Sequence, residues 1–295
     1  METIKVTVLR AGVIEALHDV HAIAVQDGAV VATAGDPGLV SFFRSCAKPL
    51  QALPLVRARQ DLDDAEIAIT CASHQAERAQ LEAVRSVLRK ASASQDDLEC
   101  GFEEGREAQR IYNECSGKHA GMLALCATKA WSAAGYRLLN HPLQQTVLSQ
   151  IALATDMHEN EIATGVEGCG TVTFALPLKR MAVAFARLEQ LEGGPTVVKA
   201  MRAHPELVGG DGADDTDLMH AMPGWIAKRG AEGLFCAAGP DGIGIALKSQ
   251  DGSQRPLRPA LAAFLGTLGT PLEQFTRVPL TNSRGEVVGE VRARY

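Results

Sequence analysis

Ser45 and Lys48, three positions apart, carry the first chemical signal in the chain. Three residues make almost one turn of an α-helix, so the serine hydroxyl and the lysine amine can face each other. A lysine activates a serine only when burial or a nearby cation keeps the amine neutral. Pro49 fits the first turn of a helix and places Ser45 at or just before the N-terminus of that helix. The spacing alone is a weak signal and favours a capping serine with a solvated lysine over a catalytic pair.

A second serine, Ser73, follows the short run Ile67–Cys71, which is rich in β-branched residues and predicts a strand. A helix is expected from about residue 75 to residue 90. Ser73 is therefore predicted at a strand-to-helix junction, where it is either a helix cap or an exposed catalytic hydroxyl. The two roles are compatible with each other.

Two cysteines lie at points where the chain turns. Cys115 and Lys118 open an apolar helix that is expected to reach about residue 130. Taken alone, Cys115 is interpreted as a buried structural cysteine and His119 as an ordinary helix histidine, because Cys-x-x-Lys is not a standard metal motif. Cys169 has a glycine on each side, which lets the backbone turn sharply and expose Cys169 or the nearby Glu167.

The last part of the chain adds a cation and an acidic run. Asp214-Asp-Thr-Asp217 lacks the spacing and the terminal Glu of a calcium loop, so it is interpreted as a solvated turn. Lys228 stands just before a Gly-Ala-Glu-Gly turn. A serine–lysine hydrolase needs a nucleophile, an amine base, a second cation that keeps the base neutral, and backbone N–H groups for the oxyanion. Ser45, Ser73, Lys48 and Lys228 supply the side chains for such a site.

The elements that must position these residues form strands at both ends and helices between them. Alternating apolar residues predict strands over 4–8, 22–25 and 30–33, with a hairpin turn at Gln26-Asp-Gly28. Further strands are expected in residues 234–247 and near the C-terminus. We therefore expect an α+β fold, with one antiparallel sheet built from both ends of a single catalytic domain. The sheet lobe would cover about residues 1–40 and 225–295, and the mostly helical lobe about residues 41–224.

Composition excludes several classes of protein. The 295 residues are 46% hydrophobic, with a net charge of −6 and no basic run, so a nucleic-acid partner is not expected. No stretch is long and apolar enough to cross a membrane, and the first residues do not resemble a signal peptide. The seven cysteines are an odd number in a chain without an export signal, which favours free thiols and a cytoplasmic location.

Several motifs together resemble the Rhizobium-type (thermolabile) L-asparaginases of the asparaginase II family. The two most specific stretches are Arg44–Ala52 and Cys115–Leu123. The motifs occur in family order over nearly the whole chain: Arg10-Ala-Gly-Val-Ile-Glu15 with His18, Arg44-Ser-Cys-Ala-Lys-Pro-Leu-Gln-Ala52, Cys71-Ala-Ser-His74, Cys115-Ser-Gly-Lys-His-Ala-Gly-Met-Leu123, His141-Pro-Leu-Gln144, Gly165-Val-Glu-Gly-Cys-Gly170, Phe174-Ala-Leu-Pro-Leu178, Lys228-Arg-Gly-Ala-Glu-Gly233 and Gly244-Ile-Ala-Leu-Lys248.

The resemblance implies a fold similar to serine β-lactamases, penicillin-binding proteins and serine glutaminases. It implies a homodimer that hydrolyses L-asparagine to L-aspartate and ammonia, with two catalytic pairs, Ser45 with Lys48 and Ser73 with Lys228. A zinc site close to the substrate would use both thiols and one amine, and its ligands would be Cys115, Lys118 and Cys169. The residues expected to hold the substrate or the oxyanion are Arg44, His74, Lys118, His119, Glu167, Gly230, Ala231 and Glu232.

Glu167 stands where the family usually has Asp, which bears on how a ligand or the substrate amine is oriented. Two alternatives stay open at this point. One is a related serine amidase that acts on glutamine or on a β-lactam-like amide. The other is a non-catalytic zinc- or ligand-binding protein in which the serines are helix caps.

Overall fold

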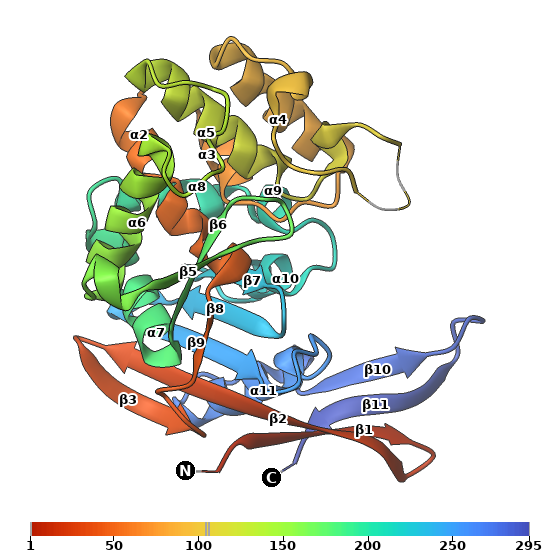
Figure 1. Cartoon of the computed structure of the whole chain (residues 1–295). Coiled ribbons are helices and arrows are strands. Elements are labelled where there is room, and N and C mark those ends of the chain that lie inside the picture. The colour runs from red at the N-terminus through yellow and green to blue at the C-terminus, as the bar shows by residue number, and fades with distance from the viewer. Residues whose placement is uncertain (1, 104, 106, 295) are drawn as a thin grey trace. The chain divides into compact units, whose positions relative to one another are not determined.

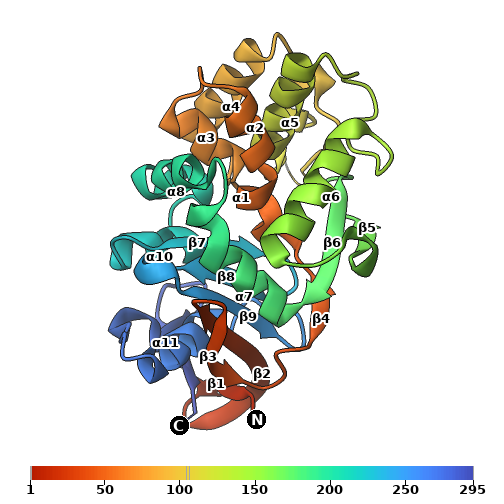
Figure 2. The same cartoon turned by 90° about the vertical axis from the view of Figure 1, so that its left-hand side faces the viewer.

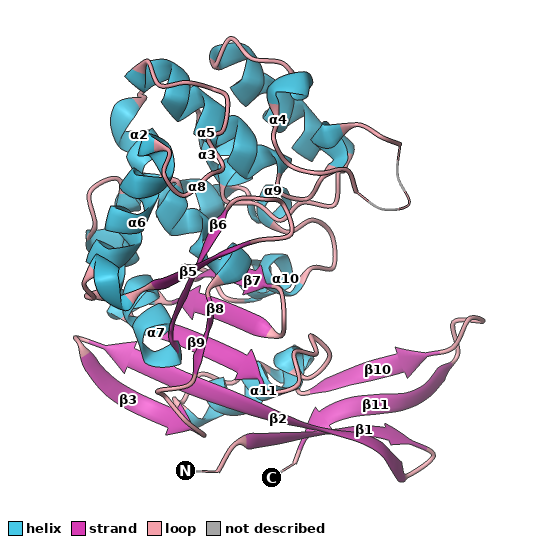
Figure 3. Ribbon diagram, viewed as in Figure 1, coloured by secondary structure: helices cyan, strands magenta, loops and turns pink. Residues whose placement is uncertain are grey.

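The computed structural model describes residues 2–103, 105 and 107–294, which form two compact units. The first unit holds residues 1–41, 177–186 and 230–295, and the second holds residues 42–176 and 187–229. Figure 3 shows by colour that the first unit is built on strands and that the second is mainly helical. None of the described helices is long and apolar enough to cross a membrane.

The first unit is organised on an antiparallel sheet in which both ends of the chain meet. Its strands run in the order β10-β11-β1-β2-β9-β8, and β3 pairs with the far end of β2. Val6 of β1 lies opposite Ala293 of β11, so the two termini are neighbours (Figure 1). The strand bounds are β1 Ile4–Arg10, β2 Val13–Gln26, β3 Ala29–Ala34, β8 Leu234–Ala238, β9 Gly244–Ser249, β10 Arg277–Thr281 and β11 Val287–Ala293.

Helices α7 (Leu178–Arg187) and α11 (Leu257–Thr267) pack on this sheet. α11 contacts β1 and β11 through a face that is almost fully buried. α7 approaches β9 closely at Gly244, where a Cβ would lie 2.1 Å from the carbonyl oxygen of Ala182. Only glycine leaves room for that contact. Two short 3₁₀ turns complete the unit, η6 (Pro240–Gly242) and η7 (Glu273–Phe275).

The second unit is a helical body around α5 (Ser116–Lys129), whose first three turns are buried on every side. Helices α2, α3 and α4 contact α5 (Figure 2). The helices are α1 Lys48–Gln51, α2 Leu53–Ala58, α3 Asp64–Thr70, α4 Arg78–Lys90, α6 Pro142–Thr155, α8 Gly194–Ala203, α9 Pro205–Val208 and α10 Asp214–Ala221. The 3₁₀ turns are η1 Arg44–Ala47, η2 Gln95–Asp97, η3 Arg110–Tyr112, η4 Glu159–Glu161 and η5 Leu188–Gln190.

Strands β5 (Ala163–Val166) and β6 (Val172–Pro177) form an antiparallel hairpin in the second unit. The loop between them carries Glu167 and Cys169, the two side chains that the sequence predicts at a sharp turn. The chain changes from one unit to the other within β4 (Val40–Phe42), within β6, at the end of α7 and within β7 (Ile226–Gly230).

The predicted α+β class with an antiparallel sheet from both chain ends is confirmed, and so is the hairpin at Gln26-Asp-Gly28. The strand predicted at Ile67–Cys71 is wrong, because these residues belong to helix α3 and its C-terminus. Asp63 caps this helix and Glu66 completes a capping box. The capping box stabilises the helix and outweighs the preference of the β-branched side chains for a strand. β6, β7 and α10 were not predicted.

Candidate active site

Ser45 lies in the 3₁₀ turn η1, directly before helix α1, as the S-x-x-K spacing and Pro49 predict. Its side chain is buried, and the backbone N–H of Lys48 donates to the carbonyl oxygen of Ser45. Arg44, the residue before it, has a φ of 46°, in the left-handed region that side-chain-bearing residues rarely adopt. Strained backbone of this kind concentrates at functional sites, and here it presents Ser45 at the start of a helix.

Lys48 is fully buried and points to the loop after α3. Its Nζ donates to the carbonyl oxygen of Ala72 at 2.6 Å and to Oγ of Ser73 at 2.9 Å. Because residues 64–70 form helix α3, Ser73 lies after a helix and not at the predicted strand-to-helix junction. The predicted pairing of Ser73 with Lys228 also differs from the structure, in which the lysine bonded to Ser73 is Lys48.

Lys228, on β7, is held by a carboxylate that the sequence did not single out. Its Nζ lies 3.0 Å from Oδ2 of Asp215 on α10 and donates to the carbonyl oxygen of Arg229 at 3.0 Å. Asp215 and Lys228 have no exposed surface. The interpretation of Asp214–Asp217 as a solvated turn is therefore wrong for Asp215. No local signal marks Asp215, because the acidic run is typical of an exposed helix start.

The two ionised groups are balanced against each other. Burial alone would raise the pKa of Asp215, but the Lys228 ammonium and Arg229 hold it below its usual value. Burial lowers the pKa of Lys228; Asp215 opposes this shift, while Arg229, and Lys48 when it carries a proton, add to it. Lys48 lies in the same region, because Cys46, two residues before it, donates to the carbonyl oxygen of Lys228 at 2.9 Å. The site thus holds two buried amines and one buried carboxylate.

A second polar cluster surrounds Lys118 on α5. Its Nζ donates to Oε2 of Glu167 at 3.0 Å, to Sγ of Cys169 at 3.2 Å and to Oγ1 of Thr171 at 2.7 Å. Three acceptors match the three protons of an ammonium group. Burial would lower the pKa of Lys118, but the negative charges of Cys169 and Glu167 raise it well above its usual value. Glu167 also lies 3.8 Å from Nε of Arg44, so the longer side chain in place of Asp reaches two cations.

The predicted zinc ligands lie together in this cluster. The hydrogen bond from the neighbouring Cys115 thiol holds the pKa of Cys169 far below its usual range. The positive charge of Lys118 lowers this pKa further, whereas burial opposes the shift. Among the described residues, no group of three His, Cys, Asp or Glu side chains is placed to hold a metal ion. A zinc site here needs Lys118 as its third protein ligand. Two sulfurs and one nitrogen suit zinc, provided that the metal displaces the proton of Lys118.

Both histidines predicted near the substrate are tied to other side chains. His74 Nδ1 accepts from the backbone N–H of Ala76, and its Nε2 lies 2.8 Å from Oγ of Ser116, so the ring anchors the Ser73 loop to α5. His119 Nδ1 lies 2.6 Å from the hydroxyl of Tyr136. Its Nε2 is buried without a hydrogen-bond partner among the described residues, and burial lowers the pKa of this ring.

The other predicted binding residues lie in the first unit. Gly230 ends β7, while Ala231 and Glu232 form the turn before β8. Glu232 has a φ of 59°, and the carbonyl oxygen of Gly230 accepts from Nε2 of Gln254 at 2.7 Å. The turn is thus held within its own unit, and its predicted role toward the oxyanion stays a prediction.

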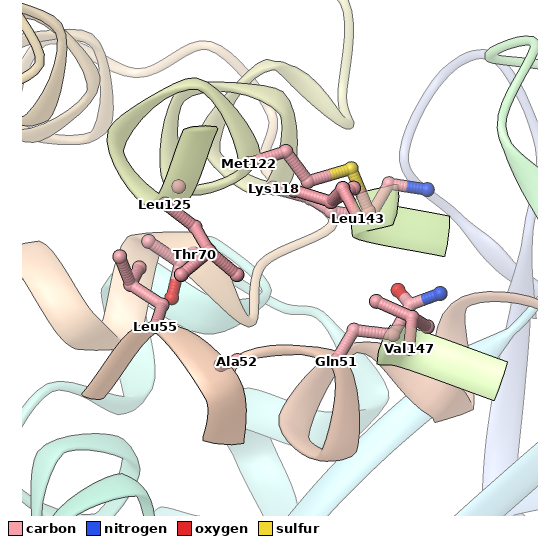
Figure 4. A pocket seen from close by; sticks show the side chains of 10 residues that line it. Gln51, Ala52, Leu55, Thr70, Lys118, Met122, Leu125, Leu143 and Val147 are labelled. Atoms are coloured by element: carbon pink, nitrogen blue, oxygen red, sulfur yellow. The ribbon is translucent and has the colours of Figure 1, made fainter. Parts of the chain in front are cut away.

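A small cavity lies beside Lys118, between α1, α5 and α6 (Figure 4). Figure 4 shows Lys118 and Met122 of α5 along one wall, with Gln51 and Val147 on another. Its free volume is about 10 Å³, which admits at most one water molecule. The buried Oε1 of Gln51 has no hydrogen-bond partner among the described residues, so a water there would satisfy it. The cavity is too small to bind an amino acid.

The fold and the site define a mixed helix and antiparallel-sheet protein in which Ser73, Lys48, Lys228 and Asp215 lie in a buried polar cluster, with Ser45 one turn before Lys48. The sequence profile of the L-asparaginase II family matches residues 6–293. The chain therefore belongs to the L-asparaginase II family and is a hydrolase of the asparaginase type.

Other comparisons add less. The search of curated proteins found no match. One similar solved structure is EstCE1, a hydrolase with promiscuous acyltransferase activity. It is 12% identical, covers 77% of this chain and 87% of its own, and has a TM-score of 0.41. Another is a β-lactamase from Mycobacterium bovis, also 12% identical, which covers 79% of this chain and 88% of its own with a TM-score of 0.34. These values are too low to support an argument about function.

Proposed function

We propose that this protein hydrolyses L-asparagine to L-aspartate and ammonia, with Ser45 as the nucleophile and Lys48 as its base. The observation that carries the proposal is the hydrogen bonding of Lys48 within a chain of the asparaginase family. A neutral amine has two N–H donors and one lone pair. Both donors of Lys48 are used by Ala72 and Ser73, which leaves the lone pair to accept the proton of Ser45.

Ser73 completes a path for that proton. Its Oγ accepts a hydrogen bond from Lys48, so its own O–H is free to donate to the departing nitrogen of the substrate. When Ser45 attacks the carboxamide carbon, its proton passes to Lys48. Lys48 then gives a proton to Ser73 as the Ser73 hydroxyl proton moves to the leaving ammonia. Water hydrolyses the acyl-enzyme by the same path in reverse.

The cluster around Lys118 offers complementary charges to an amino acid. Arg44, and Lys118 while it keeps its proton, are cations that suit the α-carboxylate of the substrate, while Glu167 is an anion that suits the α-amine. Zinc held by Cys115, Lys118 and Cys169 would replace the charge of the Lys118 ammonium with that of the metal. We further propose the Gly230–Glu232 turn as a source of N–H donors for the oxyanion.

The test is ammonia release from L-asparagine and from L-glutamine by purified protein, with and without a chelator. We expect release from asparagine and much less from glutamine. Ser45→Ala should lower turnover at least ~10³-fold, as loss of an activated nucleophile does in other serine hydrolases. Mass spectrometry with an acylating probe should place the adduct on Ser45.

Other outcomes would reject parts of the proposal. Faster release from glutamine, or hydrolysis of a chromogenic β-lactam, would identify a related amidase. An adduct on Ser73 that persists in Ser45→Ala would make Ser73 the nucleophile. If neither turnover nor an adduct is found with zinc present, the remaining interpretation is a non-catalytic ligand-binding protein.

A further inference from the structure

The buried carboxylate of Asp215 has no place in the mechanism above, yet it is bonded to the part of the site that holds Lys228. Its Oδ2 accepts from Nζ of Lys228 at 3.0 Å and from the backbone N–H of Arg229 at 3.2 Å. Its Oδ1 accepts from the backbone N–H of Thr216 at 3.2 Å. An isolated buried carboxylate is strongly unfavourable, so this one is tolerated because of these partners.

The local backbone is built to admit this carboxylate. Asp215 stands in the first turn of α10, where the helix dipole favours a negative charge. Gly209 lies against it, and a Cβ on Gly209 would come within 2.2 Å of Oδ1 of Asp215 and 2.6 Å of Oγ1 of Thr216. A side chain at residue 209 would therefore displace the carboxylate.

We propose that Asp215 is a positioning residue that fixes Lys228 as the charged member of the lysine pair and so leaves the role of base to Lys48. This inference rests on the proposed serine–lysine mechanism. Two neighbouring buried amines cannot both carry a charge at low cost. The carboxylate selects which one does, because it touches Lys228, whereas the partners that the described residues give Lys48 are the neutral Ala72 carbonyl and the Ser73 hydroxyl.

The groups that face Lys228 support this division. Asp215 on α10 favours its charged form, while Arg229 on β7 opposes it, as Lys48 on α1 does whenever it carries a proton. Cys46 on η1 donates to the carbonyl oxygen of Lys228 at 2.9 Å, and a donating thiol brings no negative charge. Without Asp215, burial and Arg229 would act against the charge with little opposition, and Lys228 would become neutral. The fixed positive charge next to Lys48 would then be lost, and with it the division of roles between the two lysines.

The test compares Asp215→Asn with Asp217→Asn, which makes the same chemical change two residues along the same helix. For Asp215→Asn we expect kcat on asparagine to fall about 10²-fold, as expected for loss of general-base catalysis. We also expect the acid limb of kcat/KM to move up by about one pH unit or more, as for loss of a nearby charge. Asp217→Asn should keep the wild-type profile. A lower rate for Asp215→Asn with an unmoved pH profile would reduce Asp215 to a structural role and overturn the proposal.

A second readout is independent of the substrate. Nuclear magnetic resonance of ¹⁵N-labelled lysine Nζ groups, assigned with Lys228→Met, follows the charge of Lys228 in any folded variant. We expect Lys228 to lose its proton at a lower pH in Asp215→Asn than in the wild type. Identical titration in the two proteins would overturn the proposal even if asparagine is hydrolysed. A wild type that hydrolyses no asparagine but shows this difference would reject the proposed substrate alone.

A double variant covers the case in which Asp215→Asn does not fold. Lys228→Met with Asp215→Asn removes both buried charges together, and it should be folded and more stable to heat than Asp215→Asn alone. If the double variant is no more stable than the single one, the carboxylate does not act through Lys228 and the proposal fails.

Discussion

Gly117→Ala is the sharpest test of how the helical packing serves the site. Gly117 lies in the first turn of α5, against the last turn of α3. A Cβ at this position would lie 2.1 Å from the carbonyl oxygen of Ile69 and 2.9 Å from its carbonyl carbon. Because the obstacle is backbone, no side-chain rotation relieves it, and the two helices must separate by about 0.9 Å to restore a 3.0 Å contact.

The Ile69 carbonyl that Gly117→Ala would displace is hydrogen-bonded to the loop that holds Lys48. The Ile69 oxygen accepts from the backbone N–H of Ala72 at 3.2 Å, and the Ala72 oxygen in turn accepts from Lys48. On the other side, α5 carries Lys118 one residue after Gly117. Overpacking of this kind costs about 1–3 kcal/mol of unfolding free energy. A misplacement of about 1 Å near a site lowers a rate by about 10²-fold.

Two further glycine variants make this a controlled experiment. Gly266→Ala, near the end of α11, meets no atom within 4 Å and should be neutral or stabilising by up to about 1 kcal/mol. Gly121→Ala meets the end of the Thr70 side chain at 2.8 Å and should be milder than Gly117→Ala. Thermal unfolding and kcat/KM on asparagine are the assays. Equal melting temperatures for Gly117→Ala and Gly266→Ala, with unchanged kcat/KM, would refute the reasoning.

Local signals explain the parts of the fold that the sequence predicts. The Asp-Gly turn fixes the β2–β3 hairpin, since the register Val25 to Val30 follows from the turn itself. Pro49 lies at the start of α1, where its missing N–H costs nothing. Ser45 could be placed before this helix for that reason. Each of these features depends on residues within a few positions of one another.

Competing local signals explain the error at α3. Ile67–Thr70 contains isoleucines and a threonine, which favour a strand when taken alone. Asp63 and Glu66 lie just upstream and form the capping box that starts the helix. The pattern Asp-x-x-Glu before an apolar run was present in the sequence and outweighs the β-branched residues. The loop carrying Ser73 therefore follows a helix C-terminus.

The connections within the site depend on tertiary folding and could not be read locally. Lys48 and Ser73 are 25 residues apart, and Asp215 and Lys228 are 13 apart. An acidic run at a helix start is usually solvated, so nothing in Asp214–Asp217 shows which carboxylate is buried. Only packing against β7 distinguishes Asp215 from its neighbours. Residue types and spacing single out these serines and lysines as candidates, whereas their contacts with one another depend on the tertiary fold.

Two further predictions concern pH and metal. Asp251 accepts from Ser249 and lies 2.6 Å from Nδ1 of His18; burial opposes these contacts, but they hold its pKa at about 2, below its usual 3.8. Because the pKa of Asp251 is depressed in the folded state, this carboxylate stabilises the protein fully above about pH 4. The stabilisation is lost as the pH falls toward 2. The difference in melting temperature between the wild type and Asp251→Asn should therefore shrink over that window. A constant difference would contradict it. Zinc binding should release protons from two ligands, because the Cys115 thiol and the Lys118 ammonium must each give up a proton, and Lys118→Met should release about one proton fewer. Calorimetry in buffers of different ionisation enthalpy measures that release. Cys169→Ser should weaken zinc binding at least ~10-fold in a competition with a zinc-sensitive dye, since a hydroxyl is a much poorer zinc ligand than a thiolate. Zinc bound as tightly by Lys118→Met as by the wild type, with the same proton release, would rule out the amine as a ligand.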